Sequence, residues 1–275
     1  MITHVSVTPE TGPDTWKYVD FFVATLSAGE GFSHDSGSRE VAIVPISGAG
    51  IVRIGGVAYP LSRSSVFTEP PHVLYAPPGC TIEIEPSAGE FTFSLGGAPA
   101  EGRYPTRLFT PDDLRVELRG GGTAYRQVGH VLSHPLPAER LILYEVHVPR
   151  GTWAAWPPHC HDGYDGSPYL EEVYYFKLDR PEGFSLQRNW CEHEDYDEQW
   201  VIRDGTMILV PKGYHVTVAC PAANMYFLNY LAGELQDDAR KTPPCFHSAY
   251  TWIDGNWDQG AWTLPLDPWA PHIAR

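Results

Sequence analysis

Short apolar segments separated by turn residues recur along the whole chain of 275 residues. The segments YVDFFVATL, EVAIVPI, RLILYEVHV and MYFLNYLA are typical, because β-branched and aromatic residues prevail in them and Gly, Pro, Asp or Ser bound them. The chain holds 26 Gly and 26 Pro, which are too many for long helices. This pattern predicts an all-β protein built as an antiparallel sandwich or barrel. Helix is expected to be a minor component, and its clearest start is Thr110, which precedes Pro111.

The charge balance excludes some classes of partner. The chain has 34 acidic and 19 basic side chains, a formal net charge of −15, which is the wrong sign for a nucleic-acid binder. No apolar run approaches the roughly 20 residues of a membrane-spanning helix, and the N-terminus lacks the plan of a signal peptide. The five cysteines are scattered without a C-x-x-C pair, which suits reduced thiols. We therefore expect a cytoplasmic protein with no nucleic-acid or membrane partner.

Two pairs of similar segments indicate an internal duplication. LYAPPGCTIEI at residues 74–84 and LVPKGYHVTV at residues 209–218 share a Pro-x-Gly turn that leads into a strand. Upstream, residues 39–48 resemble residues 171–180. The shared order and spacing predict two related β-units joined near Gly121. The predicted units are residues 1–122 and residues 123–275.

Two histidines in the segment WPPHCHD are candidate metal ligands. On a strand, alternate residues point to the same face, so His159 and His161 project together while Cys160 points away. Such a pair by itself is more often an ordinary pair of hydrogen-bonded histidines. The interpretation as a metal site therefore depends on residues farther along the chain.

Further candidate ligands come after this pair in a fixed order. Glu171 and Glu172 open the next β-segment, and only one of these neighbours can face the histidines. About 40 residues later, the turn PKGYH places His215 at the start of another strand. Imidazoles combined with one carboxylate suit Zn²⁺, Fe²⁺, Mn²⁺ or Ni²⁺.

The strings WPPHCHD, PYLEEVYYF, GFSLQR and LVPKGYH together resemble the 5-deoxy-glucuronate isomerases of inositol catabolism. That family is grouped with the 5-keto-4-deoxyuronate isomerases of pectin breakdown. The resemblance is weak over the first half and strong over residues 126–233. It implies a bicupin fold, with two jelly-roll barrels in one chain, and one divalent metal ion, Zn²⁺ before Mn²⁺, Fe²⁺ or Ni²⁺, in the second barrel.

The resemblance also implies a set of metal ligands: His159, His161, Glu172 and His215. In the first unit Thr81 stands where His215 stands in the second, although Glu40 and His34 are present. We therefore expect the first unit to be a degenerate barrel without a metal. The segment from Lys241 onward matches the family ending poorly, so the resemblance implies nothing there.

The implied reaction is the isomerisation of the aldose 5-deoxy-glucuronate to the ketose 2-deoxy-5-keto-gluconate, through an enediol. The anionic sugar-acid substrate favours an arginine for its carboxylate. Arg188 is our first candidate, with Gln187 beside it, and Arg126 is the second. The acid–base candidates are Glu171, Tyr214 and Lys212.

Two other functions fit the same pattern. A three-His, one-Glu site on this fold also suits a metal-dependent dioxygenase, because it can hold Fe²⁺ and activate O₂. A bicupin can also bind a sugar without catalysis. The pattern is compatible with a monomer or a homo-oligomer.

Overall fold

A computed structural model of the chain describes residues 1–257. In this part of the chain, three antiparallel sheets carry nearly all of the regular structure. The expectation of an all-β protein is confirmed. The helices are single turns of 3-10 helix: η1 (Pro111–Asp113), η2 (Gly122–Ala124), η3 (Tyr164–Gly166), η4 (Asp237–Lys241) and η5 (Thr251–Gly255). None of the described helices is long and apolar enough to cross a membrane.

The first half of the chain forms one sheet of eight strands. Its strands are β1 (Ile2–Val7), β2 (Asp20–Leu26), β3 (Phe32–Asp35), β4 (Arg39–Ile54), β5 (Val57–Arg63), β6 (Val73–Ala76), β7 (Thr81–Pro99) and β8 (Arg107–Phe109). The order is β1-β2-β7-β4-β6-β8, with β3 beside β7 and β5 beside β4.

Strands β4 and β7 let this sheet fold back on itself. They pair along most of their length, and their register shifts near Gly48. Gly48 has a φ of +85°, and a Cβ there would lie 2.0 Å from the carbonyl oxygen of Glu90, so the bend requires glycine. Val41 from one end of β4 and Ile54 from the other end pack in the same core, which gives a closed sandwich.

The second half forms two sheets that face each other. The six-stranded sheet has the order β16-β13-β18-β11-β10-β9, and the five-stranded sheet has the order β15-β14-β17-β12-β19. The strands of the first are β9 (Arg115–Arg119), β10 (Arg126–His130), β11 (Ile142–Val148), β13 (Leu170–Leu178), β16 (Met207–Val210) and β18 (Met225–Gly233). The strands of the second are β12 (Trp153–Cys160), β14 (Ser185–Trp190), β15 (Asp197–Ile202), β17 (Tyr214–Ala219) and β19 (Cys245–Phe246).

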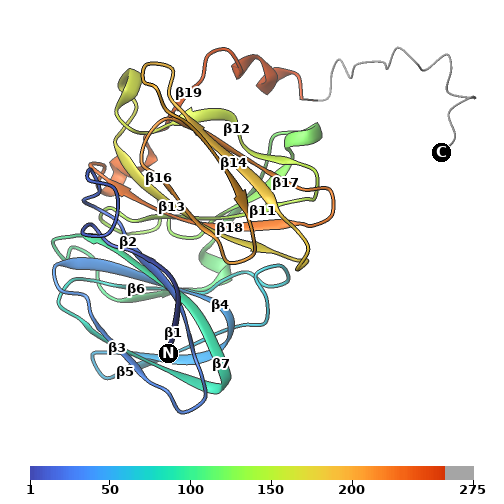
Figure 1. Cartoon of the computed structure of the whole chain (residues 1–275). Helices are drawn as coiled ribbons and strands as arrows, with labels where there is room; N and C mark the ends of the chain where they lie inside the picture. The colour runs from blue at the N-terminus through green and yellow to red at the C-terminus, as the bar shows by residue number, and fades with distance from the viewer. Residues whose placement is uncertain (258–275) are drawn as a thin grey trace, which may run out of the picture.

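The six-stranded sheet is the middle layer of the molecule (Figure 1). In β13, Val173 and Tyr175 pack against the first half, whereas Tyr174 and Phe176 pack inside the second sandwich. Every residue of β18 is buried. A strand covered on both faces is apolar along its whole length, which explains why LEEVYYFKL and MYFLNYLAG show little alternation.

The link between the halves lies in the same middle sheet. Strand β9 pairs with β10 and so belongs to the sheet of the second half. The predicted boundary between residues 122 and 123 falls between these two strands. As a boundary between folding units it stays a prediction.

Two buried carboxylates join the halves in the same way from opposite sides. Glu40, in the first half, accepts the backbone N–H groups of residues 139–141 at 2.6–2.7 Å. Glu171, in the second half, accepts the backbone N–H groups of residues 17–19 at 2.5–2.8 Å. This reciprocal arrangement supports the predicted duplication, because equivalent side chains make equivalent contacts.

Candidate metal centre and its cavity

The histidine cluster is built from strands β12 and β17 of the five-stranded sheet. Ala154 pairs with Thr217, and His159 pairs with His215, so five steps along β12 match only two along β17. The three extra residues form a bulge, which brings His159 directly opposite His215. His161 follows one residue after the end of β12.

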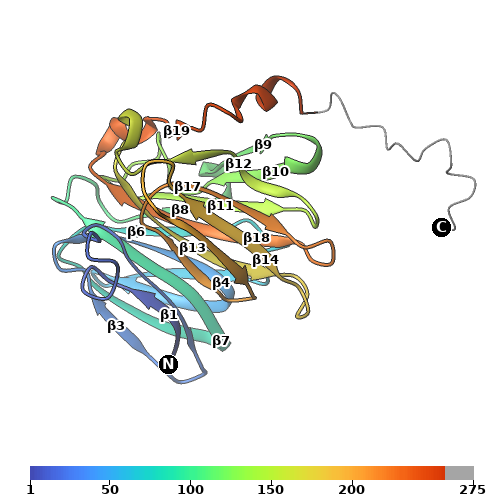
Figure 2. The ribbon, with the colours of Figure 1, turned by 45° about the horizontal axis from the view of Figure 1, so that its top comes forward.

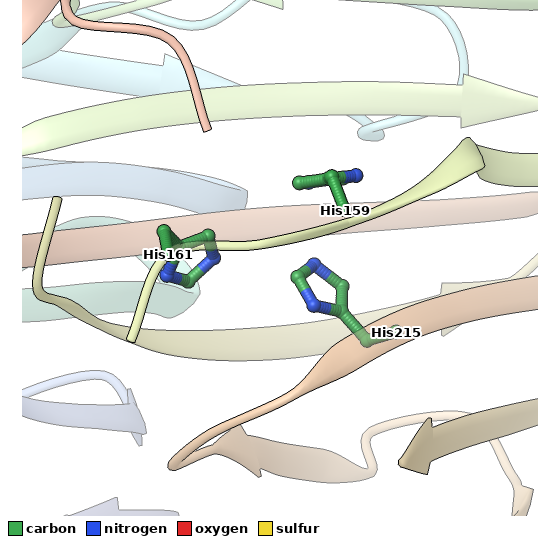
Figure 3. Close-up of side chains that lie close together, drawn as sticks. All are labelled: His159, His161 and His215. Carbon is green, nitrogen blue, oxygen red and sulfur yellow. The ribbon is translucent and has the colours of Figure 1, made fainter. Parts of the chain in front are cut away.

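The three imidazoles lie close together, as Figure 3 shows. One nitrogen from each of His159, His161 and His215 lies within 4.8 Å of the others. The carboxylate of Glu172, on β13 of the opposite sheet, lies 3.0 Å from Nε2 of His161 and 3.3 Å from Nε2 of His215. The structure therefore brings together all four side chains of the expected ligand set.

Two further groups orient these side chains. The other ring nitrogen of His161, Nδ1, lies 2.8 Å from the carbonyl oxygen of Leu170, and the amide of Asn229 donates to Glu172. Partners of this kind fix the tautomer and the orientation of metal ligands. Asn229 is a residue that the sequence pattern did not reveal.

The electrostatics of the cluster favour the neutral form of His159 and His215. Desolvation and the nearby His161 lower the pKa of His159 to about 3, and desolvation with the other two histidines lowers the pKa of His215 far below its usual value. Desolvation also acts on His161, but its hydrogen bond and charge interaction with Glu172 raise its pKa. A neutral imidazole is the form that binds metal ions.

The donor set fits a divalent metal ion. Both ring nitrogens of His215 are buried without a hydrogen-bond partner in the described part of the chain, which is costly unless another ligand satisfies them. Three imidazoles and one carboxylate are the donors that Zn²⁺, Mn²⁺, Fe²⁺ and Ni²⁺ accept. These residues can therefore hold a metal ion.

The corresponding positions of the first half carry no such set. Val41 pairs with Ala76, just before one Pro-x-Gly turn, and Glu172 pairs with Val210, just before the other. Val41 thus occupies the place of Glu172. The predicted match of residues 39–48 with residues 171–180 sets Glu40 against Glu172. The strand pairing shows that this match is one residue out of register, and that the counterpart of Glu40 is Glu171.

The same comparison extends to the histidines. Asp35 pairs with Thr81 in the first half, as His159 pairs with His215 in the second. Asp35 and Thr81 therefore replace two imidazoles, and His34 corresponds to none of the ligands. An apolar Val41 in place of the carboxylate leaves no comparable donor set there.

A cavity of about 540 Å³ opens beside the cluster, between the two sheets of the second half. His159, His161 and Glu172 line it, and so does Arg126 on β10. Arg126 is 8% exposed and donates to the carbonyl oxygens of Ala124 and Trp156 at 3.0 and 2.9 Å. Within residues 1–257 it forms no ion pair, so this buried cation can receive a ligand anion.

The two other candidate substrate residues lie elsewhere. Arg188 is on the outer face of β14, where it binds Asp197 through two hydrogen bonds of 2.8 and 2.7 Å and lies over the ring of Trp190. Gln187 points inward and donates to Asn189 at 3.1 Å, but it is not among the residues that line the cavity. Alternation along β14 accounts for the difference, because one of two neighbours must face outward.

The three candidate acid–base residues also lie away from the cluster. Glu171 faces the first half, where it accepts three backbone N–H groups. Tyr214 packs on the outer side of the five-stranded sheet, with its ring 4.6 Å from that of His247. Lys212 is paired with Glu194 at the surface. The structure brings none of them to the cavity.

The cavity wall contains polar residues that sequence reasoning missed. His130 pairs with Tyr144, Tyr144 with Asn229, and Asn229 with Tyr174, so these four form one polar row across the middle sheet. The alternation of Arg126, Val128 and His130 in β10 was a usable signal. Tyr144, Asn229 and Tyr174 lie in strands that are buried on both faces. In such strands the pattern of polar and apolar residues does not show which face a side chain occupies.

The last part of the chain that the structure describes, residues 241–257, lines one side of the cavity. Figure 2 shows it beside β12 at the end of the second sandwich. Lys241, Phe246 and Asp254 line the cavity, and the ring of Phe246 lies 5.9 Å from that of His159. The sequence resemblance implied nothing for this segment.

Comparison with known proteins places the chain in a family. The model of the KduI/IolB family matches residues 2–253. The chain belongs to the KduI/IolB family. Two relatives, both named 5-deoxy-glucuronate isomerase, come from Geobacillus kaustophilus and Geobacillus thermodenitrificans. The chain is 35% and 33% identical to them, and each alignment covers 84% of this chain and 85% of the relative.

A solved structure supports the same placement. The chain superimposes with a TM-score of 0.84 on an IolB-like protein from Salmonella typhimurium. The two are 31% identical, and the match covers 90% of this chain and 94% of the other. The resemblance inferred from the sequence motifs is thus confirmed, and the KduI/IolB fold is the fold of this chain.

Proposed function

We propose that this protein interconverts 5-deoxy-glucuronate and 2-deoxy-5-keto-gluconate, as an aldose–ketose isomerase of sugar-acid catabolism. The observation that carries the proposal is that one cavity holds both the histidine cluster, which can bind a metal ion, and the buried guanidinium of Arg126, which forms no ion pair within residues 1–257. A sugar acid can place its hydroxyl and carbonyl oxygens at the histidine cluster and its carboxylate at Arg126. The names of the relatives support the choice of substrate.

The proposed metal ligands are His159, His161, Glu172 and His215, with Zn²⁺ as the first choice before Mn²⁺, Fe²⁺ and Ni²⁺. When bound, a divalent ion supplies Lewis acidity that stabilises negative charge on substrate oxygens by several kcal/mol. Asn229 and the carbonyl of Leu170 hold Glu172 and His161 in place.

The proposed carboxylate-binding residue is Arg126 rather than Arg188. Two of the five N–H donors of a guanidinium can grip one carboxylate, and Arg126 donates only two of its own to backbone carbonyls. Arg188 already binds Asp197 outside the cavity.

The isomerisation needs a proton to move between neighbouring carbons. A base removes the proton from the carbon that bears the hydroxyl, and the electron pair of this C–H bond becomes the double bond of the enediol. The aldehyde oxygen gains a proton as the enediol forms. A proton is then added to the former aldehyde carbon, which becomes CH₂OH, while the neighbouring hydroxyl loses its proton and becomes the ketone. The reaction therefore requires a protein group that exchanges protons within the cavity.

The proposed reaction is tested by incubating the metal-loaded protein with 5-deoxy-glucuronate in D₂O and recording NMR spectra. We expect the aldehyde signal to be replaced by that of a ketose whose terminal carbon carries solvent deuterium. If metal-loaded protein leaves this sugar and related uronates unchanged, the isomerase assignment is overturned. Oxygen uptake with the same substrates would then favour a dioxygenase, and binding without conversion a sugar-binding module.

Arg126→Ala tests the site of carboxylate recognition, with Arg188→Ala as the matched control. We expect Arg126→Ala to weaken the apparent affinity by about 1.5–3 kcal/mol, because a charged hydrogen-bonding partner is lost. Arg188→Ala should leave KM within about twofold of the wild type. If steady-state kinetics showed weaker binding in Arg188→Ala and not in Arg126→Ala, the carboxylate site would lie on β14.

A cytoplasmic location and a homo-oligomeric state stay predictions.

A further inference from the structure

Three side chains at the edge of the cavity form a chain of hydrogen bonds that the proposed function does not yet use. Oε1 of Glu117 lies 3.0 Å from Nε2 of His130, and Nδ1 of His130 lies 2.8 Å from the hydroxyl oxygen of Ser133. His130 and Ser133 are 5% and 3% exposed, and both line the cavity that holds the histidine cluster. A carboxylate, an imidazole and a hydroxyl in this order are a known means of activating a hydroxyl group.

One tautomer of His130 suits this chain of hydrogen bonds. With the proton on Nε2, that nitrogen can donate to an ionised Glu117, and Nδ1 can accept from the hydroxyl of Ser133. Nη2 of Arg115 lies 2.9 Å from Nδ1 and 2.7 Å from Nε2 and opposes a positive charge on the ring. Burial lowers the pKa of His130, the hydrogen bond to Glu117 opposes this, and the charge of Arg115 adds to it. The imidazole is thus neutral, and its unprotonated nitrogen has a lone pair that can accept a proton.

The relay and the metal ligands belong to the same wall of the cavity. His130 pairs with Tyr144, and Tyr144 pairs with Asn229, whose amide donates to the proposed ligand Glu172. Neighbouring strands lie about 4.8 Å apart, so two strand spacings, roughly 10 Å, separate His130 from Asn229. His130 and Asn229 both line the same cavity.

We propose that Ser133, supported by His130 and Glu117, is the group that exchanges protons with the substrate carbons, an inference that rests on the proposed isomerase function. The hydroxyl oxygen of Ser133 takes the proton from the hydroxyl-bearing carbon while its own proton passes to Nδ1 of His130. The broken C–H bond leaves its electron pair in the enediol, and the imidazolium is stabilised by Glu117. The aldehyde oxygen gains a proton as the enediol forms, and the neighbouring hydroxyl oxygen loses one as the ketone forms. The reverse transfer through Ser133 delivers a proton to the former aldehyde carbon, so no oxidant or reductant is needed.

In this relay Ser133 is the catalytic residue, whereas His130 and Glu117 act through it. A purely structural role for His130 predicts a different outcome, in which its substitution lowers stability without a specific effect on proton exchange. The deuterium content of the product and the metal content of the protein separate the two.

The test compares Ser133→Ala and His130→Gln with His147→Gln. His147 lies on the neighbouring strand β11, hydrogen-bonds to the carbonyl oxygen of Val66 at 2.8 Å, and does not line the cavity. We expect kcat to fall about 10²–10⁴-fold in both relay variants, with KM within about threefold and full metal content. Incorporation of solvent deuterium at the terminal carbon should slow in parallel. His147→Gln should keep wild-type turnover.

Three outcomes would overturn the relay. Wild-type turnover in Ser133→Ala and His130→Gln would exclude it and leave the isomerase function intact. Loss of turnover that follows loss of metal would assign both residues to the support of the metal site. A wild-type protein that does not convert the sugar would remove both proposals together. If His130→Gln does not fold, Ser133→Ala decides alone, because it removes a single oxygen atom.

Discussion

The neighbouring residues Glu171 and Glu172 differ only in the face of β13 that they occupy, and this decides what each of them does. Glu172 points into the second sandwich toward His161 and His215. Glu171 points the other way and accepts three backbone N–H groups of the first half. Because they differ by one position, each is a control for the other.

Glu172→Gln and Glu171→Gln should therefore affect different properties, the first the metal affinity and the second the stability. We expect Glu172→Gln to reduce metal affinity at least about tenfold, because an anionic donor is lost, with little change in stability. Glu171→Gln should keep its metal and lose about 1–3 kcal/mol of unfolding free energy, because an amide satisfies the buried N–H groups poorly. Elemental analysis and urea denaturation measure the two effects. Metal loss in Glu171→Gln alone would contradict this assignment.

At the scale of elements, two similar turns precede the strands that carry Thr81 and His215. Gly213 has a φ of +80°, and a Cβ there would lie 2.4 Å from the carbonyl oxygen of Trp190. Gly79, its counterpart in the first half, has a φ of +75° with no atom within 4 Å of that position. Of these two left-handed turns, only the one beside the histidine cluster is closely packed.

This difference predicts the effect of alanine in each turn. Gly79→Ala should cost about 1–2 kcal/mol, the strain of a left-handed alanine. Gly213→Ala should cost more, since its methyl group also displaces backbone, and it should lower metal affinity by moving His215. Chemical denaturation and metal titration check both variants. Equal losses of stability with unchanged metal binding would show that the packing against Trp190 is unimportant.

Edge strand β9 carries a carboxylate that links stability to pH. Burial disfavours the charged form of Glu117, but the hydrogen bond with His130 and the charge of Arg119 outweigh it and lower the pKa to about 2. A lowered pKa means that the stabilisation is complete above the ordinary value of 4.5 and is lost as the pH falls toward 2.

Glu117→Gln should accordingly flatten the acid limb of the stability curve. Between pH 4.5 and about 2, the unfolding free energy of the variant should fall less steeply than that of the wild type. Urea denaturation at a series of pH values, in metal-free buffer, gives both curves. Parallel curves over this range would show that Glu117 is not a source of acid sensitivity.

At the scale of the whole molecule, a buried ion pair spans the interface between the halves. Arg63 at the end of β5 and Glu145 on β11 have side chains that are 0% and 2% exposed. Two hydrogen bonds of 2.6 and 2.9 Å join them, and the hydroxyl of Tyr226 donates to the same carboxylate at 2.6 Å. Removing one partner leaves the other charge buried without compensation.

Glu145→Gln should therefore destabilise the protein by about 3–5 kcal/mol. A double variant with Arg63→Met and Glu145→Leu should recover part of this loss, because neither charge is then buried. As a control, Glu85→Gln removes the acid of the exposed pair with Arg53 and should cost less than about 1 kcal/mol. Similar costs for Glu145→Gln and Glu85→Gln in chemical denaturation would contradict the importance of burial.

Local patterns in the sequence were sufficient for the fold class, and together with the family resemblance they indicated the proposed ligand set. The alternation of apolar residues and the frequent turns imply antiparallel sheets, because each strand shows its own periodicity. His159 and His161 are two residues apart, so strand alternation predicted that they project together. The pairing of β12 with β17 brings His215 opposite His159. The choice of Glu172 over Glu171 came from the family resemblance, and the structure places Glu172 at the cluster.

Only the tertiary structure decided which polar residues reach the cavity. Arg126 lies in it and Arg188 does not, although both stand on strands with similar patterns. The row from His130 to Asn229 crosses three strands, two of which belong to the centre of the middle sheet. A strand covered on both faces shows no contrast between a core side and a solvent side, so its sequence cannot indicate which face turns toward the cavity. That choice depends on how the layers pack, which is a property of the whole chain.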